Sequence, residues 1–270
     1  MSEAPAVTIS LVALNQRRDL ERLLPTLLPA AATAGAEVLL VNNRSTDGTA
    51  EFMAANYPAV SVVENPDVAG YGENHNINLK RSSGRYFVVM NSDMTVAEDV
   101  FARMRDYMDA NPGVGACCPK VLNPDGTIQG LNKLLPTVWD LFLRRFMPGP
   151  LKKYFRRRME AFEMRDVGYD HSYYVPSLSG CFMFCRADLI KRLGGFDEKY
   201  FLYFEDTDLC RSIQLTHTTM YVPEAVVTHY WARSAHISYR AMWLFIKSTA
   251  RYFNKWGYDF FRNPGRPGSN

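Results

Sequence analysis

The chain has 270 residues, of which 47% are hydrophobic, and this is enough to bury one large core. Its formal net charge is only +3, so nothing in the composition indicates a nucleic-acid partner. No run of about 18 apolar residues occurs and the first residues lack a signal segment, so no membrane-spanning helix or export is predicted.

Strand and helix patterns alternate along the first part of the chain. Short apolar runs rich in β-branched residues predict buried strands over residues 7–14, 37–42, 60–64 and 86–90. Amphipathic patterns predict helices between them, over residues 19–34, 49–56 and 71–81. This alternation is typical of an α/β fold with a mostly parallel central sheet and helices on both faces. The polar loops that follow the strands are expected to meet at one sheet edge and form a binding site there.

A polar tripeptide, Asn91-Ser92-Asp93, directly follows the apolar run of residues 86–90. Polar groups at the carboxyl end of a buried parallel strand lie where open α/β sheets bind ligands. A carboxylate there can hold a hard divalent cation, which in turn binds nucleotide phosphates. The alternative is a plain turn, because isolated tripeptides of this kind usually form one.

A second group of acids, Glu205, Asp206 and Asp208, follows the apolar run of residues 200–204. Because that run is expected to be buried, the acids are expected to line a cleft. Carboxylates held together against apolar walls suit a general base or a metal site. The alternative is that Glu205 and Asp206 only begin a helix and interact with its dipole. The acidic site at Asp93 favours the functional interpretation.

Several blocks of the sequence resemble, in order, those of family 2 glycosyltransferases, and in particular the bacterial rhamnosyltransferase-like branch. The resemblance covers residues 7–234 and is carried by VTISLVALN, VNNRSTDGT, NPDVAGYGENHNINL, VVMNSD, GGFDEKYFLYFEDTDLCRSI and YVPEAVVTHY. It implies a GT-A fold, a nucleotide-sugar donor, a divalent cation (Mg²⁺ or Mn²⁺) and transfer with inversion at the anomeric carbon.

The resemblance also implies roles for single residues. The tripeptide Asn91-Ser92-Asp93 falls on the family's D-x-D position, which leaves Asp93 as the principal metal carboxylate. His229 matches the downstream histidine that completes the cation's coordination in many relatives, although a lone histidine after a strand is usually structural. Asp206 matches the catalytic base of the E-D motif, and Glu205 is the alternative base.

Further positions are implied to bind the nucleotide. The acid that the family usually carries in its first loop is replaced here by Asn42-Asn43, which keeps hydrogen-bonding capacity but loses the charge. Asp47 would lie near the nucleobase or cap the next helix, and Arg233 could reach the diphosphate. The full implied set is Asn15, Asn42, Asn43, Asp47, Asn65, Gly70, Gly72, Asn76, Asn91, Ser92 and Arg233.

Two segments stand apart from the α/β pattern. The transferase domain is expected over residues 1–236 with a flexible or helical insertion at about 131–166, followed by a C-terminal helix at 237–262 and a disordered tail at 263–270. Both the insertion and the helix interleave aromatic and basic residues. This pattern suits a mobile flap or a surface that lies on the inner face of the cell membrane. Ordinary solvated helices or a homodimer contact are the alternatives.

The location and the substrates follow from the same observations. Five cysteines without paired C-x-x-C spacing favour a reducing compartment, and the cytoplasm is the simplest location. The resemblance favours dTDP-rhamnose as donor, with UDP-sugars left open. It favours a surface polysaccharide or a polyprenyl-linked glycan as acceptor.

Two other functions are alternatives to glycosyl transfer. A nucleotidyltransferase would need a glycine-rich, basic loop after the first strand, and residues 14–17 lack one. A non-catalytic nucleotide-sugar-binding module is suggested by Asn42 and Asn91, which stand in place of acids. Retention of Asp93, Glu205, Asp206 and His229 argues against that module.

Overall fold

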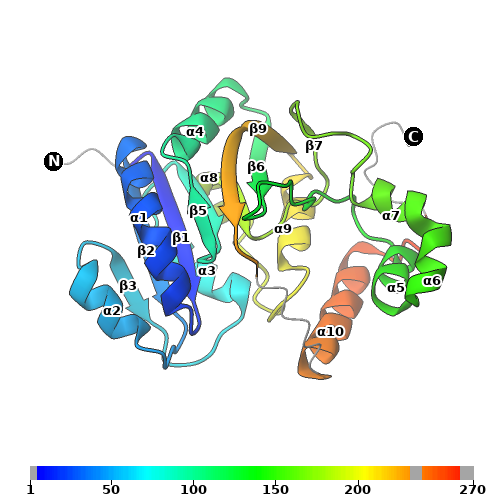
Figure 1. Cartoon of the computed structure of the whole chain (residues 1–270), viewed down its shortest axis with the longest axis horizontal. Helices are drawn as coiled ribbons and strands as arrows, with labels where there is room; N and C mark the ends of the chain where they lie inside the picture. The colour runs from blue at the N-terminus through cyan, green and yellow to red at the C-terminus, as the bar shows by residue number, and fades with distance from the viewer. Residues whose placement is uncertain (1–4, 232–238, 262–270) are drawn as a thin grey trace.

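A computed structural model describes residues 5–231 and 239–261 of the chain. One sheet runs through the centre in the order β3-β2-β1-β4-β8-β6-β9-β5, with β7 added beside β9 (Figure 1). Its strands are β1 (Val7–Ala13), β2 (Ala36–Asn42), β3 (Ser61–Glu64), β4 (Tyr86–Met90), β5 (Met94–Val96), β6 (Val114–Leu122), β7 (Tyr173–Tyr174), β8 (Phe182–Arg186) and β9 (Thr218–His229).

The first half of the sheet is parallel, as the alternating pattern predicts. Strands β3, β2, β1 and β4 all run in one direction, so their carboxyl ends share one edge. Strand β4 is buried along its whole length, which explains its continuous apolar sequence. The helices between these strands are α1 (Arg17–Thr33), α2 (Thr49–Asn56) and α3 (Tyr71–Arg81).

The second half of the sheet is mixed. Strand β8 lies between β4 and β6 and is antiparallel to both, whereas β6 and β9 are parallel to each other. The sheet is therefore mixed, and its parallel character is concentrated before β8. Helix α4 (Val100–Ala110) still connects β5 to β6, and β8 follows only after the long helical insertion that comes after β6.

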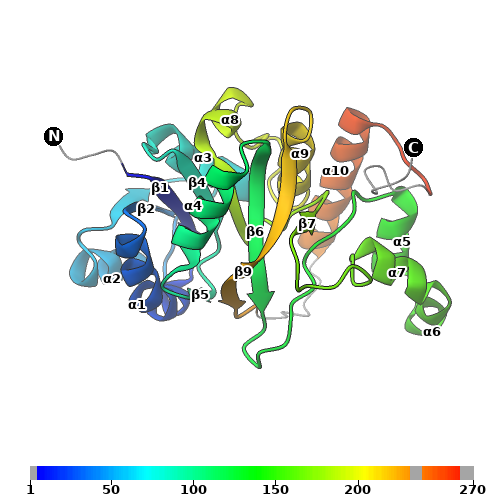
Figure 2. The same cartoon turned by 90° about the horizontal axis from the view of Figure 1, so that it is seen from above.

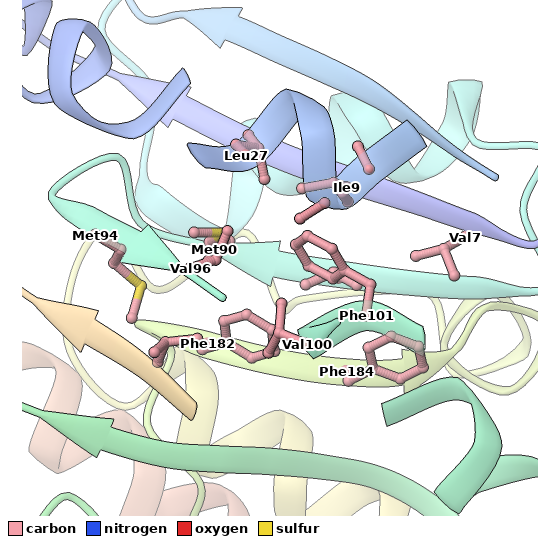
Figure 3. Close-up of a cluster of buried hydrophobic side chains, with 14 of the residues drawn as sticks. Val7, Ile9, Leu27, Met90, Met94, Val96, Val100, Phe101, Phe182 and Phe184 are labelled. Carbon is pink, nitrogen blue, oxygen red and sulfur yellow. The ribbon is translucent and has the colours of Figure 1, made fainter. Parts of the chain in front are cut away.

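Helices cover both faces of the sheet. Helices α1 and α4 (Val100–Ala110) lie on one side, and α3, α8 (Ala187–Arg192) and α9 (Glu205–Ile213) lie on the other (Figure 2). Each side buries its own cluster of apolar side chains. On the first side, Leu27 of α1 and Phe101 of α4 reach the sheet beside Phe182 of β8 (Figure 3). The Phe101 and Phe182 rings stack with centroids 6.1 Å apart.

Two helical segments lie together at the end of the molecule away from β3 (Figures 1 and 2). The first is the expected insertion, which forms α5 (Val138–Phe146), α6 (Gly149–Lys152), the 3₁₀ turn η1 (Lys153–Phe155) and α7 (Arg156–Phe162). The second is the C-terminal helix α10 (Tyr239–Trp256). The tail expected over residues 263–270 lies outside the described residues.

Helix α10 docks on α9 through a buried carboxylate. Asp208 accepts hydrogen bonds from Lys255 Nζ and from Trp256 Nε1, each at 2.7 Å. Tyr252 and Phe253 bury their rings in the same contact, against Tyr200 and the residue before α9. A buried carboxylate is costly unless it is hydrogen-bonded, so this contact fixes where α10 lies. Among the helices in the described ranges, none is both long and apolar enough to span a bilayer.

Candidate active site

The carboxyl ends of β4 and β9 bring Asp93 and His229 together. Strand β5 follows Asp93 at once and pairs with the end of β9, so that Met94 lies opposite His229. The backbone N–H of Tyr230 also donates to the Asp93 carbonyl at 2.7 Å. As a result, Asp93 Oδ1 and His229 Nε2 lie 3.1 Å apart, although the two residues are 136 positions apart in the chain.

Gln129 fixes the orientation of the His229 ring. Its side-chain amide nitrogen donates to Asn123 Oδ1 (2.8 Å) and to the His229 carbonyl (3.2 Å). Its Oε1 must therefore accept from His229 Nδ1, at 2.8 Å. A neutral imidazole that donates through Nδ1 carries a lone pair on Nε2, and this lone pair faces the Asp93 carboxylate. A proton or a metal cation between the two atoms is needed to make that contact favourable.

The turn that begins α9 presents the other acids. Tyr203 and Phe204 both have left-handed backbone conformations, with φ of 71° and 70°. Such conformations cost an ordinary residue of the order of 1 kcal/mol each and are found at functional sites. Both rings pack on Phe245 of α10, with centroids 5.8 Å away. The helix thus supports a strained turn that leads directly into Glu205 and Asp206.

Asp206 is held by two backbone N–H groups. The Gly180 N–H donates to Oδ2 at 2.9 Å, and the Thr207 N–H donates to Oδ1 at 2.7 Å. Hydrogen bonds of this kind stabilise the charged carboxylate and fix its plane. Asp206 is only partly buried, so each oxygen keeps capacity for a further hydrogen bond.

Glu205 has the opposite environment. Its side chain is buried, and its Oε2 has no hydrogen-bond partner among the described residues. Burial and then the nearby charge of Asp206 raise the pKa of Glu205 to about 8. Glu205 therefore keeps its proton at neutral pH, unlike an ordinary glutamate.

The hydroxyl of Tyr71 links the two acidic groups. It lies 2.9 Å from Asn91 Oδ1 and 2.7 Å from the carbonyl of Gly180, whose N–H donates to Asp206. Burial of this hydroxyl, together with the charges of the surrounding acids, raises the pKa of Tyr71 well above its usual value. The acids concerned include Glu205, Asp206 and Asp93. The Tyr71 hydroxyl thus connects Asn91, in the tripeptide that ends at Asp93, with Gly180, which holds Asp206.

The implied nucleotide residues of the first two loops bond mainly to one another. Asn15 accepts from the Thr46 N–H at 2.7 Å, and Asn43 makes two hydrogen bonds to the backbone of Ala69. Asn42 donates to Glu64 at 2.7 Å. These contacts bind the loops after β1, β2 and β3 into one rigid edge.

Asp47 joins the starts of two helices. It accepts from the Arg17 N–H at the start of α1 and from Thr49 at the start of α2. Burial alone would raise the pKa of Asp47, but the hydrogen bonds from Thr49 and Arg17 lower it overall. The geometry accounts for Asp47 as a helix-capping carboxylate, which is one of the two roles expected for it.

The implied residues of the next loop are packed against the chain that precedes α9. A Cβ on Gly70 would approach the Phe201 backbone to 2.9 Å, and one on Gly72 would approach the Phe196 side chain to 2.6 Å. The Asn76 side-chain amide donates to the Phe196 carbonyl through Nδ2 and accepts from the Phe196 N–H through Oδ1. Asn65 donates to Asn74 at 3.0 Å. These contacts explain the two glycines and Asn76 without a ligand.

The remaining implied residues lie nearer the acids. Asn91 accepts from Tyr71, and its N–H donates to the Cys181 carbonyl at 2.9 Å. The Ser92 hydroxyl is buried without a partner among the described residues. Arg233 lies outside the described residues. Tyr71 and Gln129 were not identified from the sequence, since a tyrosine at a helix start and a glutamine in a loop carry no motif of their own.

A family model described as glycosyltransferase like family 2 matches residues 5–253. The chain belongs to glycosyltransferase family 2. It is 30% identical over 233 residues to the N-acetylglucosaminyl-diphospho-decaprenol L-rhamnosyltransferase of Mycobacterium tuberculosis, covering 80% of this chain and 73% of the relative. The rhamnosyltransferase-like resemblance is thereby confirmed.

Solved structures place this family 2 glycosyltransferase in the GT-A fold. GalNAc-T7 with UDP, GalNAc and Mn²⁺ matches with a TM-score of 0.67 at 16% identity, over 94% of this chain and 48% of that chain. The mannosyltransferase PcManGT from Pyrobaculum calidifontis, in complex with GDP-Man and Mn²⁺, matches with a TM-score of 0.62 at 20% identity. That match covers 94% of this chain and 65% of PcManGT.

The Asp93–His229 pair of this glycosyltransferase fits a divalent cation. A carboxylate oxygen and an imidazole nitrogen with facing lone pairs are suitable ligands, and Gln129 holds the ring as metal-bound histidines are usually held. Within the described ranges, no group of three or more His, Cys, Asp or Glu residues could hold a metal. Such a cation would therefore need further oxygen ligands from phosphates and water, as Mg²⁺ commonly has.

Glu205→Gln is expected to flatten the pH dependence of stability between pH 4.5 and about 8. A glutamate of ordinary pKa loses its proton near 4.5, whereas folded Glu205 keeps it to about 8. Between these values the native state binds more protons, so the free energy of unfolding of the wild type falls as pH rises. The slope from this group is about 1.4 kcal/mol per pH unit, and glutamine lacks it. Denaturant unfolding at stepped pH, without added metal, measures both proteins; equal slopes would contradict the assignment.

Proposed function

We propose that this glycosyltransferase moves rhamnose from dTDP-rhamnose to a hydroxyl of a lipid-linked glycan, with inversion and with a divalent cation. The observation that carries the proposal is that the Tyr71 hydroxyl contacts Asn91, two residues before Asp93, and the carbonyl of Gly180, whose N–H donates to Asp206. These contacts join the proposed cation site and the proposed base at one edge of the sheet. The name of the Mycobacterium tuberculosis relative supports the sugar and the lipid-linked acceptor.

Asp206 is the proposed catalytic base. An inverting transfer needs a charged carboxylate that accepts the proton of the acceptor hydroxyl while its oxygen attacks the anomeric carbon. The two N–H donors orient the Asp206 carboxylate, and its side chain is partly exposed. Glu205 is buried and holds its proton, so it is the poorer candidate.

Asp93 and His229 are the proposed protein ligands of the cation. When bound there, a divalent cation would stabilise the negative charge that develops on the departing nucleoside diphosphate. Asp93 also raises the pKa of Asp19 on α1, after the larger effect of burial. The site is therefore rich in negative charge before any ligand arrives, which favours a cation there.

Asp206→Asn is expected to lower turnover by roughly 10²-fold or more and to leave donor binding nearly unchanged, because only proton transfer is lost. The measurement is release of nucleoside diphosphate, together with donor affinity by calorimetry. Asp188→Asn, at an exposed carboxylate of α8, is the matched control and should match the wild type. Should Glu205→Gln show the kinetic defect and Asp206→Asn not, the base is Glu205.

Asp93→Ala is expected to abolish the part of nucleoside diphosphate binding that depends on Mg²⁺ or Mn²⁺. A cation with one protein ligand fewer should bind more weakly, while contacts to the nucleoside are retained. Calorimetric titration of dTDP with each metal and with a chelator measures the effect, and His229→Ala should behave alike. Unchanged affinity and metal dependence in Asp93→Ala would place the cation elsewhere.

We also propose that the helical end of the molecule contacts an anionic membrane surface. The aromatic–basic face is defined by exposed apolar and basic side chains of α5, α6, η1, α7 and α10. Its members are Phe142, Phe146, Leu151, Lys152, Lys153, Arg156, Arg157, Trp243, Ile246 and Lys247. Exposed apolar groups beside bases match the boundary between lipid tails and anionic headgroups.

Lys153→Glu with Arg157→Glu is expected to weaken binding to anionic vesicles at least about tenfold, because each base contributes about 1 kcal/mol at such a surface. Cosedimentation at low and high salt measures it, with neutral vesicles as reference. Lys80→Glu with Lys199→Glu, away from this face, is the matched control. Negligible binding of the wild type to both kinds of vesicle would reassign the face to a solvated surface, or to a dimer contact if light scattering shows a dimer.

A further inference from the structure

Tyr71 joins three segments of the chain at the candidate active site. Its N–H donates to the Phe201 carbonyl at 3.0 Å, in the stretch that leads into α9. Its hydroxyl lies 2.7 Å from the carbonyl of Gly180, shortly before β8, and 2.9 Å from Oδ1 of Asn91, directly after β4. Its ring packs edge-on against the buried ring of His75, with centroids 4.6 Å apart. The place of the phenol is therefore fixed through its backbone, its ring and its hydroxyl.

The contact with Gly180 reaches the proposed base. The Gly180 N–H donates to Asp206 Oδ2 at 2.9 Å, so Tyr71 and Asp206 bond to the two polar groups of one residue. The two side chains also enclose Gly180, because a Cβ there would lie 3.4 Å from both Tyr71 Cε1 and Asp206 Cβ. A glycine backbone has more conformational freedom than any other, so its orientation depends on such contacts. Loss of the phenol contact would therefore loosen the N–H that holds Asp206.

The Tyr71 phenol has one proton for two acceptors. Neither the Gly180 carbonyl nor Asn91 Oδ1 can donate to it. Burial raises the pKa of Tyr71 well above its usual value, so the proton stays on the phenol. The Gly180 contact is the shorter of the two, and Asn91 offers only a neutral amide oxygen in competition. A carboxylate at position 91 would compete more strongly, because hydrogen bonds to ionised acceptors are about twice as strong as neutral ones.

We propose that Tyr71 is a positioning residue for the transfer reaction: its hydroxyl orients Gly180, and the Gly180 N–H in turn orients the Asp206 carboxylate. Asn91 takes part because its neutral side chain does not withdraw the Tyr71 proton from Gly180. This inference rests on the proposed function, because it takes Asp206 as the base. It also gives a reason for the asparagine that stands in place of the first acid of the D-x-D motif.

Tyr71→Phe is expected to lower kcat about five- to a hundredfold, the usual cost of leaving a buried hydrogen-bonding group without its partner, and to leave the donor KM unchanged. Release of nucleoside diphosphate at saturating donor and Mg²⁺ measures kcat. Amide hydrogen exchange at Gly180, followed by NMR, should accelerate by a similar factor. Tyr221→Phe is the matched control, since this buried tyrosine of β9 donates to the Tyr169 carbonyl at 3.1 Å. It should keep the wild-type kcat and the wild-type exchange at Gly180.

Asn91→Asp tests the competition for the phenol proton. In the wild type it is expected to lower kcat at saturating Mg²⁺, although the added carboxylate would favour a cation. In Tyr71→Phe it should have little further effect on kcat, because no phenol proton is left to withdraw. Such non-additivity distinguishes an action through the Tyr71 hydroxyl from two independent losses of packing.

The outcomes separate this inference from the proposed function. A wild type that releases no nucleoside diphosphate with any nucleotide sugar would overturn the proposed function. An active wild type whose Tyr71→Phe variant keeps its kcat, or keeps slow exchange at Gly180, would overturn the inference alone. Equal effects of Asn91→Asp in both backgrounds would do the same. A rise in donor KM without a fall in kcat would also overturn it, because Tyr71 would then serve donor binding.

Discussion

The candidate active site depends on the antiparallel insertion of β8 beside β4. Because the two strands run in opposite directions, the residue that follows β4 lies next to the residue that precedes β8, and the Asn91 N–H donates to the Cys181 carbonyl. Gly180 is thereby placed where it contacts both Tyr71 and Asp206. In a purely parallel sheet the start of β8 would lie at the opposite edge, and the two acidic groups would be separated by the length of a strand.

The second constraint is the support that α10 gives to the turn before α9. Two consecutive residues in left-handed conformation would relax toward ordinary backbone if nothing opposed them. The rings of Tyr203 and Phe204 are held on Phe245, and the buried Asp208 anchors the far end of the same helix. The contacts of α10 therefore stabilise the geometry of Glu205 and Asp206 rather than that of the sheet.

The sequence predicts the bounds of single helices and strands best. Helices α2 and α3 and strand β4 begin and end at the predicted residues, because hydrophobic period and turn residues specify them within a few positions. The direction of β8 was not predictable, since no local pattern states which neighbour a strand will choose. The contact of Asp93 with His229 needed the family resemblance, and the hydrogen bond from Gln129 had no signal at all. The positions of Gly70, Gly72 and Asn76 in the sequence also do not indicate that these residues take part in the packing of α3.

The contact between α9 and α10 has a consequence for biosynthesis. Lys255 follows its partner Asp208 by 47 residues, and every strand of the sheet precedes α10 in the chain. Domains assemble from the N-terminus while translation continues. A nascent chain can thus complete the whole sheet, including the loops after β1, β2 and β3, while the turn before α9 still lacks its support. The edge formed by these loops is therefore completed first, and the geometry of the proposed base is set only when α10 has left the ribosome.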